Sequence, residues 1–197
     1  MKTLMKSQAV VAPILLIRPG STDFDEQHRI KGSLDMPMSD EGHEQVALMI
    51  NDVATFRPKT IYAAPCESAR QTAEALSEIC NAKVKTVEEF VNVDHGLWHG
   101  KLIDELRRNH PKIYKRAQEA AEEVCPPGGE SLPDATRRIE KIIKKITKRR
   151  GGDVIALVVP DPLAGLVRGL LCDEPLVNLW DAETDQAQWN LIEPAIK

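Results

Sequence analysis

One stretch of six residues, 154–159, constrains the fold of this chain more than any other. Its sequence, VIALVV, is an uninterrupted run of apolar and mostly β-branched residues. A strand in the middle of a parallel sheet is covered on both faces and needs that pattern. Shorter runs at 14–17 and 60–64 are predicted as further strands, and 83–87 as a strand nearer the edge of the sheet.

Helical segments alternate with these strands. Apolar residues recur at helical spacing in 40–56, 68–80, 132–149 and 163–172. Ser39 or Asp40 is a suitable N-cap for the first of these helices. The residues expected on the buried faces of the first three are Val46, Leu48, Met49, Val53, Ala69, Thr72, Ala73, Leu76, Ile79, Ile139, Ile142, Ile143 and Ile146. The alternation predicts an α/β fold, a three-layer α/β/α sandwich around a mostly parallel sheet.

The central part of the chain follows a different pattern. Residues 101–109 and 111–123 are two polar helical segments, and the loop CPPGGES follows them. We interpret this part, about 97–135, as a small helical cap inserted over one end of the sheet. Because 197 residues is an ordinary length for one domain, we expect a single domain over 1–197.

Charge and cysteine content exclude several classes of protein. The formal net charge of −4 argues against a nucleic-acid partner and against binding to an acidic membrane, and no apolar stretch approaches the about 20 residues that span a bilayer. The four cysteines lack CxxC spacing, which indicates free thiols in a reducing, cytoplasmic compartment and no metal site. The run AVVAPILLI fits a buried first strand. A secretory signal peptide is the alternative, disfavoured by the lack of a cleavage site.

The helix predicted over 132–149 carries a run of basic residues into the segment that follows it. They are Arg137, Arg138, Lys141, Lys144, Lys145, Lys148, Arg149 and Arg150. Such a run is typical of a solvated helix face, with cations placed near the negative end of the helix dipole. An acidic partner or a phosphate-rich ligand is the alternative interpretation.

Six segments of the chain occur in an order that one protein family shares. They are LIRPGSTDFDEQHRIKG from Leu16, LDMPMSDEG from Leu34, IYAAPCESARQTAEAL from Ile61, FVNVDHGLWHGKLIDEL from Phe90, PPGGESLPD from Pro126, and the VIALVV strand. Together they resemble the histidine phosphatase superfamily, the phosphoglycerate-mutase-like proteins. The resemblance extends to about residue 172 and implies the phosphoglycerate-mutase-like α/β fold.

The resemblance also implies a mechanism. In the family a histidine after the first strand attacks phosphorus, two arginines and a second histidine hold the phosphate oxygens, and a carboxyl group transfers a proton. The nucleophile position holds Pro19, whose tertiary amide nitrogen has no free lone pair. The first arginine is retained as Arg18, but the second position holds Ser68, with Arg70 two residues further along. The glutamate position holds Asn92, whose amide exchanges no proton at neutral pH.

The second family histidine is expected just beyond the VIALVV strand. The sequence there is two residues longer than the family pattern, so the position falls on Asp161, Pro162 or Leu163, depending on where the gap is placed. None of these donates a hydrogen bond to a phosphate oxygen, and an ionised Asp161 repels one. Four of five site residues are therefore replaced, and losing the nucleophile alone can lower the rate about a million-fold.

From these replacements we expect a pseudoenzyme with no catalytic residues and no cofactor. Its non-catalytic role is either to bind a small anion (phosphate, sulfate or a phosphorylated metabolite) in the cleft beside Arg18 or to bind a protein partner. The candidate anion-binding residues are Arg18, Ser21, Thr22, Arg70 and His95. The alternative is a weak phosphatase that acts on a phosphate ester through a rearranged site, with His28 or His95 as the relocated nucleophile.

Overall fold

The computed structural model describes residues 13–148, 153–175, 178–182 and 187–193. Its centre is a five-stranded sheet in the order β3-β2-β4-β1-β5. The strands are β1 (Ile14–Ile17), β2 (Thr60–Ala63), β3 (Lys83–Thr86), β4 (Ile155–Val158) and β5 (Trp189–Ile192). Neighbouring strands pair in parallel except β5, which is antiparallel to β1. The predicted α/β fold with a mostly parallel sheet is confirmed, and the VIALVV segment supplies the middle strand.

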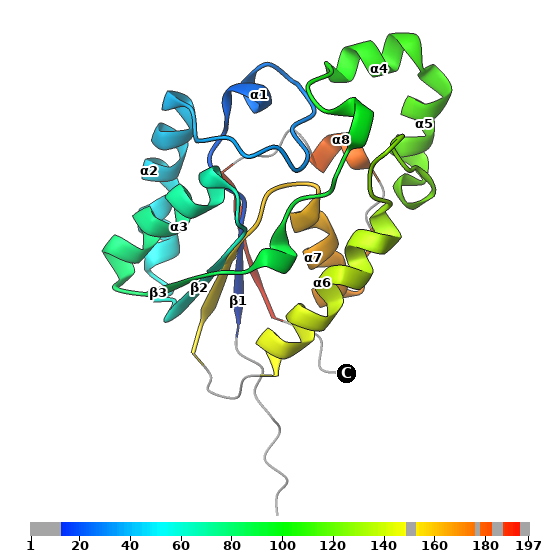
Figure 1. The fold of residues 1–197 in the computed structure, drawn as a ribbon. Helices are drawn as coiled ribbons and strands as arrows, with labels where there is room; N and C mark the ends of the chain where they lie inside the picture. Colours follow the sequence, from blue (N-terminus) through cyan, green and yellow to red (C-terminus); the bar gives the residue numbers. More distant parts are fainter. Residues whose placement is uncertain (1–12, 149–152, 176–177, 183–186, 194–197) are drawn as a thin grey trace, which may run out of the picture.

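Helices cover both faces of this sheet (Figure 1). Helices α2 (Asp40–Ala54) and α3 (Glu67–Cys80) pack together on one face, and α6 (Leu132–Thr147) and α7 (Leu163–Cys172) on the other. The four predicted helices therefore form, with ends within two residues of those expected. Ser39 caps α2, because its hydroxyl oxygen accepts a hydrogen bond from the Gly42 N–H at 3.0 Å.

Two residues expected on buried helix faces are exposed. Leu48 is 82% exposed, because it lies about 200° around the helix from Val46, the residue that points to the core with Ile50 and Val53. Ile79, in the last turn of α3, is 53% exposed and lines a groove between α2 and α3. The face of α2 and α3 that points away from the sheet therefore carries apolar side chains.

Short helices gather beyond the carboxyl ends of the parallel strands (Figure 1). They are α1 (Asp23–Glu26), η2 (Gly96–Trp98), α4 (Ile103–Asn109), α5 (Pro111–Glu119) and α8 (Leu179–Ala182), while the 3₁₀ turns η1 (Glu88–Phe90) and η3 (Ala121–Glu123) border α6. The Trp180 ring of α8 stacks on Tyr114 at 5.3 Å, and its indole N–H donates to the Tyr114 carbonyl at 3.1 Å. None of the described helices combines the length and the apolar character that a membrane crossing needs.

The strand β5 is the main element that the sequence pattern did not predict. It lies at the edge of the sheet beside β1, where Ile14 pairs with Ile192. Trp189 of this strand meets the Phe56 ring edge-on at 5.2 Å. Because β5 holds the outer edge of β1, the loop that follows β1 is supported on both sides.

Candidate functional site

Two neighbouring strands end side by side and bring Arg18 and Asp161 together. Ile17, the last residue of β1, is paired with Val158, the last residue of β4, so the loops that follow both strands begin at the same edge of the sheet. Arg18 Nε forms an ion pair with Asp161 Oδ2, and the two side chains are 14% and 1% exposed. The guanidinium that the sequence suggested for anion binding is thus already in contact with a carboxylate of the same chain.

The side-chain amide of Asn92 holds the loop that carries Asp161. Its Nδ2 donates to the carbonyl of Asp161 at 2.7 Å and to that of Gly32 at 3.0 Å. Its Oδ1 accepts from the backbone N–H of Leu163 at 3.3 Å, in the first turn of α7. An ionised carboxylate only accepts hydrogen bonds, so a glutamate at position 92 would leave both carbonyls without this donor. Asn92 therefore connects the loops after β4 and after α1 through bonds that an amide alone provides.

The polar groups of the loop after β1 are engaged with neighbours. Ser21 Oγ donates to Gln45 Oε1 of α2 at 2.9 Å, and Thr22 donates from both its hydroxyl and its backbone N–H to Asp25 Oδ2 at 2.7 Å. Ser21 is 4% exposed and Thr22 is fully buried. Pro19 is also buried, and its carbonyl accepts from the Ala187 N–H at 2.9 Å. These residues shape the loop through contacts within the chain.

A second buried ion pair joins Lys31 to Asp25. The Lys31 Nζ lies 2.7 Å from Asp25 Oδ2, and the side chains are 6% and 4% exposed. Neither residue is among the site residues predicted from the sequence. The sequence does contain a signal for Asp25. A threonine followed three residues later by an acidic residue, as in Thr22 and Asp25, is the pattern of a helix capping box.

A cavity of about 180 Å³ adjoins these residues at the carboxyl ends of β2 and β4. Its polar lining comes from Lys31, Ser33, Asp35, Cys66, Ser68 and Asn92. Two positions that the resemblance links to catalysis, Ser68 and Asn92, therefore lie in one cavity. The Ser68 hydroxyl is 3.8 Å from the Cys66 thiol. Histidine and arginine are both missing from the described lining.

The structure places Arg70 away from this cavity. Its side chain is 44% exposed and forms an ion pair with Glu67 on the outer surface of α3. Ser68, two residues earlier, is 1% exposed and lines the cavity. Two residues correspond to about 200° around a helix, so Arg70 points in nearly the opposite direction. Arg70 therefore lies away from Ser68, the position aligned with the second family arginine.

The two candidate histidines lie in the loops after α1 and before η2. His95 is 1% exposed, with its ring 6.5 Å from that of Trp98 and 6.4 Å from that of His99. His99 Nε2 accepts from the His95 backbone N–H at 3.1 Å. His28 is exposed in the loop after α1, with a positive φ of 54°. Neither histidine is among the described residues that line the cavity with Ser68 and Asn92.

The four cysteines are free thiols. Burial raises the pKa of Cys80, and burial together with the nearby Glu174 carboxylate raises the pKa of Cys172. Both thiols are therefore protonated to a greater extent at neutral pH than an ordinary cysteine. In the described parts of the chain, no group of three or more histidine, cysteine or acidic side chains is arranged to hold a metal ion.

The sequence of this chain matches a known protein family over most of its length. The family model described as Histidine phosphatase superfamily (branch 1) matches residues 14–195. The chain belongs to this superfamily. Phosphoserine phosphatase 1 of Hydrogenobacter thermophilus is 26% identical over 180 residues, which are 91% of this chain and 85% of the relative. The chain spans only 43% of a longer relative, the Bifunctional protein Rv2228c of Mycobacterium tuberculosis, with 26% identity over 79% of this chain.

Solved structures of this superfamily share the fold. The phosphoglycerate mutase of Bacillus anthracis superposes with a TM-score of 0.79 at 18% identity, covering 92% of this chain and 87% of the mutase. The mycobacterial glucosyl-3-phosphoglycerate phosphatase Rv2419c in complex with inorganic phosphate has a TM-score of 0.74 at 21% identity, covering 91% and 95%. The same phosphatase is known as a complex with VO3. The family inferred from the six ordered segments is confirmed.

Proposed function

We propose that this chain is a non-catalytic member of the histidine phosphatase superfamily, in which a carboxylate of the chain itself takes the place of the bound anion. The observation that carries the proposal is the buried ion pair between Arg18 and Asp161. Arg18 is the arginine of the LIRPG segment, and Asp161 is one of three residues aligned with the second family histidine. A phosphate group and Asp161 would compete for one guanidinium.

The charges around the cavity support this proposal. Arg18 and Lys31 each have a carboxylate partner within the chain, Asp161 and Asp25 respectively. Asp35 adds another carboxylate to the cavity lining. A phosphate dianion would meet cations that are already paired and a further negative charge, which disfavours its binding.

The chemistry of the lining supports it as well. The residue aligned with the nucleophile is Pro19, whose nitrogen forms no phosphoryl adduct. Ser68 and Cys66 carry nucleophilic atoms, but such atoms need a base to activate them. In the described structure neither makes a hydrogen bond to a histidine. Among the described residues, the lining therefore pairs no nucleophile with a histidine base for phosphoryl transfer through a covalent intermediate.

Of the two non-catalytic roles, the geometry favours binding a protein partner over binding an anion, because the charge of Arg18 is already neutralised by Asp161. A weak phosphatase with a rearranged site is the second candidate. It is favoured by the 26% identity to a relative named a phosphoserine phosphatase, and it requires His28 or His95 to act as the nucleophile.

A phosphatase assay separates the two candidates. Purified chain and the variant Arg18→Ala are compared on 4-nitrophenyl phosphate and on a phosphoglycerate, with phosphate release followed over hours. The proposal predicts no release above a buffer blank, and the same result for both proteins. Turnover that co-purifies with the chain and disappears in Arg18→Ala contradicts it, as does a phosphohistidine trapped at His28 or His95 by rapid acid-free quenching and mass spectrometry.

A further inference from the structure

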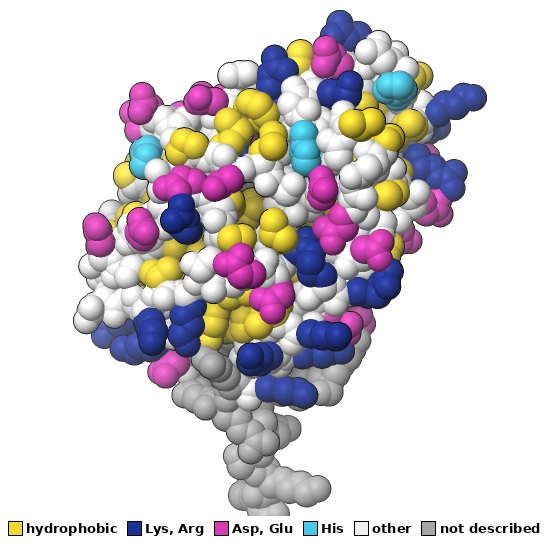
Figure 2. Space-filling model, viewed as in Figure 1, with side chains coloured by type: hydrophobic (Ala, Val, Ile, Leu, Met, Phe, Trp, Pro, Cys, Tyr) yellow, Lys and Arg dark blue, Asp and Glu magenta, His cyan; other side chains and the backbone are white. Residues whose placement is uncertain are grey.

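The two helical layers of this fold carry opposite charge. Helices α2 and α3 together contain seven acidic residues and one arginine, whereas α6 and the residue after it contain six lysines or arginines and two acidic residues. These layers lie on opposite faces of the sheet (Figure 1). In Figure 2, acidic side chains lie over α2 and α3, and lysines and arginines lie along the lower half of α6. The net charge of −4 is thus divided very unevenly over the surface.

The acidic layer has an apolar groove between α2 and α3. The groove, about 420 Å³, has an apolar floor formed by Val46, Ala47, Ile50, Ala75 and Ile79. Glu74 and Glu78 stand at its edge, one helical turn apart. The ion pairs between described residues include neither glutamate. This groove therefore offers apolar surface bordered by uncompensated negative charge.

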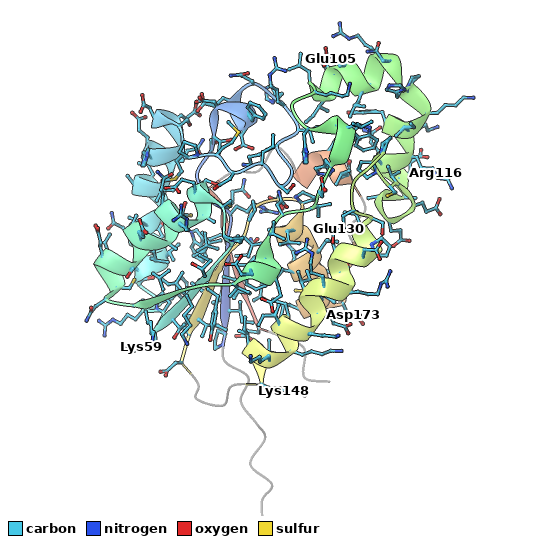
Figure 3. The ribbon with its side chains drawn as sticks, in the orientation of Figure 1. Lys59, Glu105, Arg116, Glu130, Lys148 and Asp173 are labelled. Atoms are coloured by element: carbon cyan, nitrogen blue, oxygen red, sulfur yellow. The ribbon has the colours of Figure 1, made fainter. Side chains whose placement is uncertain are left out.

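The outer face of α6 carries the complementary pattern. Lys141, Lys145 and Lys148 follow one another at helical spacing on its exposed side, and none belongs to an ion pair with another described residue. Lys148 lies at the lower end of the helix in Figure 3. Lys141 and Lys145 are four residues apart, about 6 Å along the helix, and Glu74 and Glu78 on α3 have the same separation.

We propose that the outer face of α6 docks on the groove between α2 and α3 of a second copy of this chain, in a head-to-tail arrangement. The occupant is a second copy because both complementary halves belong to one sequence, yet they lie on opposite faces of the sheet and cannot meet within one molecule. Lys141 and Lys145 then face Glu74 and Glu78 of the second copy. Because the two docking surfaces differ, each added copy still has one unoccupied docking surface. Further copies can bind there, so the assembly grows into a chain of molecules.

Exposed charges set the expected behaviour of this contact. Their attraction is screened within about 8 Å at physiological ionic strength and within about 3 Å at 1 M salt. We therefore expect weak association that tightens at least about 10-fold when the salt concentration is lowered from about 0.5 M to about 20 mM. The surfaces involved lie outside the cavity, so this inference is independent of whether the chain is catalytic.

Charge reversal tests the proposal with the full chain. The first variant, Glu74→Lys with Glu78→Lys, places lysines at both docking surfaces, and the second, Lys141→Glu with Lys145→Glu, places glutamates at both. Each variant alone is expected to be monomeric in sedimentation velocity runs at low salt, under conditions in which the unaltered chain associates. An equimolar mixture of the two is expected to associate, because the reversed faces again complement each other.

A matched control reverses two lysines elsewhere. Lys112→Glu with Lys115→Glu on α5 changes the net charge as the second variant does, and it is expected to leave self-association unchanged. Circular dichroism and thermal unfolding verify that every variant is folded, and the milder pair Glu74→Gln with Glu78→Gln is expected to weaken association partly. An unaltered chain that stays monomeric at low salt, or a mixture of the two reversed variants that does not associate, overturns the proposal.

Discussion

Removing the charge of Asp161 is expected both to destabilise the fold and to create a phosphate site. The variant Asp161→Asn keeps the shape of the side chain but leaves Arg18 without its ion-pair partner, at a position where the arginine side chain is only 14% exposed. Removing one partner of a buried ion pair typically costs about 3–5 kcal/mol. Because Arg18 keeps some contact with solvent, we expect about 3 kcal/mol, which lowers the Tm of a chain of this size by about 6–12 °C.

Phosphate is then expected to restore much of that loss. A ligand present at about 100 times its Kd stabilises the folded state by about 2.7 kcal/mol, so the Tm of Asp161→Asn should rise by about 5–11 °C in such an excess of phosphate. The unaltered chain should show no phosphate-dependent rise, because Asp161 already holds the arginine. Glu119→Gln, which removes the same charge from an exposed pair with Lys115, is the control and should change stability by less than about 1 kcal/mol.

Differential scanning fluorimetry with chloride at equal ionic strength as the reference measures both effects. The reasoning is refuted if Asp161→Asn is as stable as the unaltered chain, or if phosphate stabilises both proteins equally. Equal stability would mean that the Arg18–Asp161 ion pair does not stabilise the loops after β1 and β4. Equal stabilisation by phosphate would mean that the Asp161 carboxylate and phosphate do not compete for Arg18.

Three further predictions concern the surroundings of this ion pair. Gly20→Ala places a methyl group 2.4 Å from the Gly42 carbonyl oxygen. We therefore expect the free energy of unfolding, measured in urea, to fall by about 2 kcal/mol or more. An unchanged urea midpoint would show that the loop after β1 shifts to accommodate the methyl group. Asn92→Leu leaves three backbone groups without their partner and should cost about 3 kcal/mol by the same measurement; a loss below about 1 kcal/mol contradicts its bracing role. At pH 8 iodoacetamide should label Cys80 more slowly than the exposed Cys125, because the raised pKa of Cys80 reduces its thiolate fraction. Equal labelling rates for the two cysteines in peptide mapping would refute this.

The sequence predicted most of the sheet because the strands β1 to β4 each carry a local signal. The apolar run of β4 requires burial on both faces, and it occupies the middle of the sheet. The strand β5 has no such signal. Its residues alternate weakly, and its place is set by pairing with β1, which lies at the other end of the sequence. Leu48 shows a related limit, because apolar character alone does not tell on which side of α2 a residue points.

For the candidate site, the resemblance indicated residues but not their contacts. The resemblance pointed to Arg18, Ser68, Asn92 and Asp161, and the structure joins Arg18 to Asp161 and places Ser68 and Asn92 in one cavity. That Asp161 would contact Arg18 depends on the pairing of β1 with β4, which no local pattern contains. The role of Asn92 as a double donor likewise depends on two carbonyls from distant loops.

Whether an anion can displace Asp161 from Arg18 is visible directly in crystals soaked with vanadate, which mimics phosphate at the point of transfer. The account predicts that the Arg18–Asp161 contact persists and that no vanadate is seen beside either residue or bonded to a ring nitrogen of a histidine. Vanadate bound at Arg18 with Asp161 turned away, or linked covalently to His28 or His95, would contradict it.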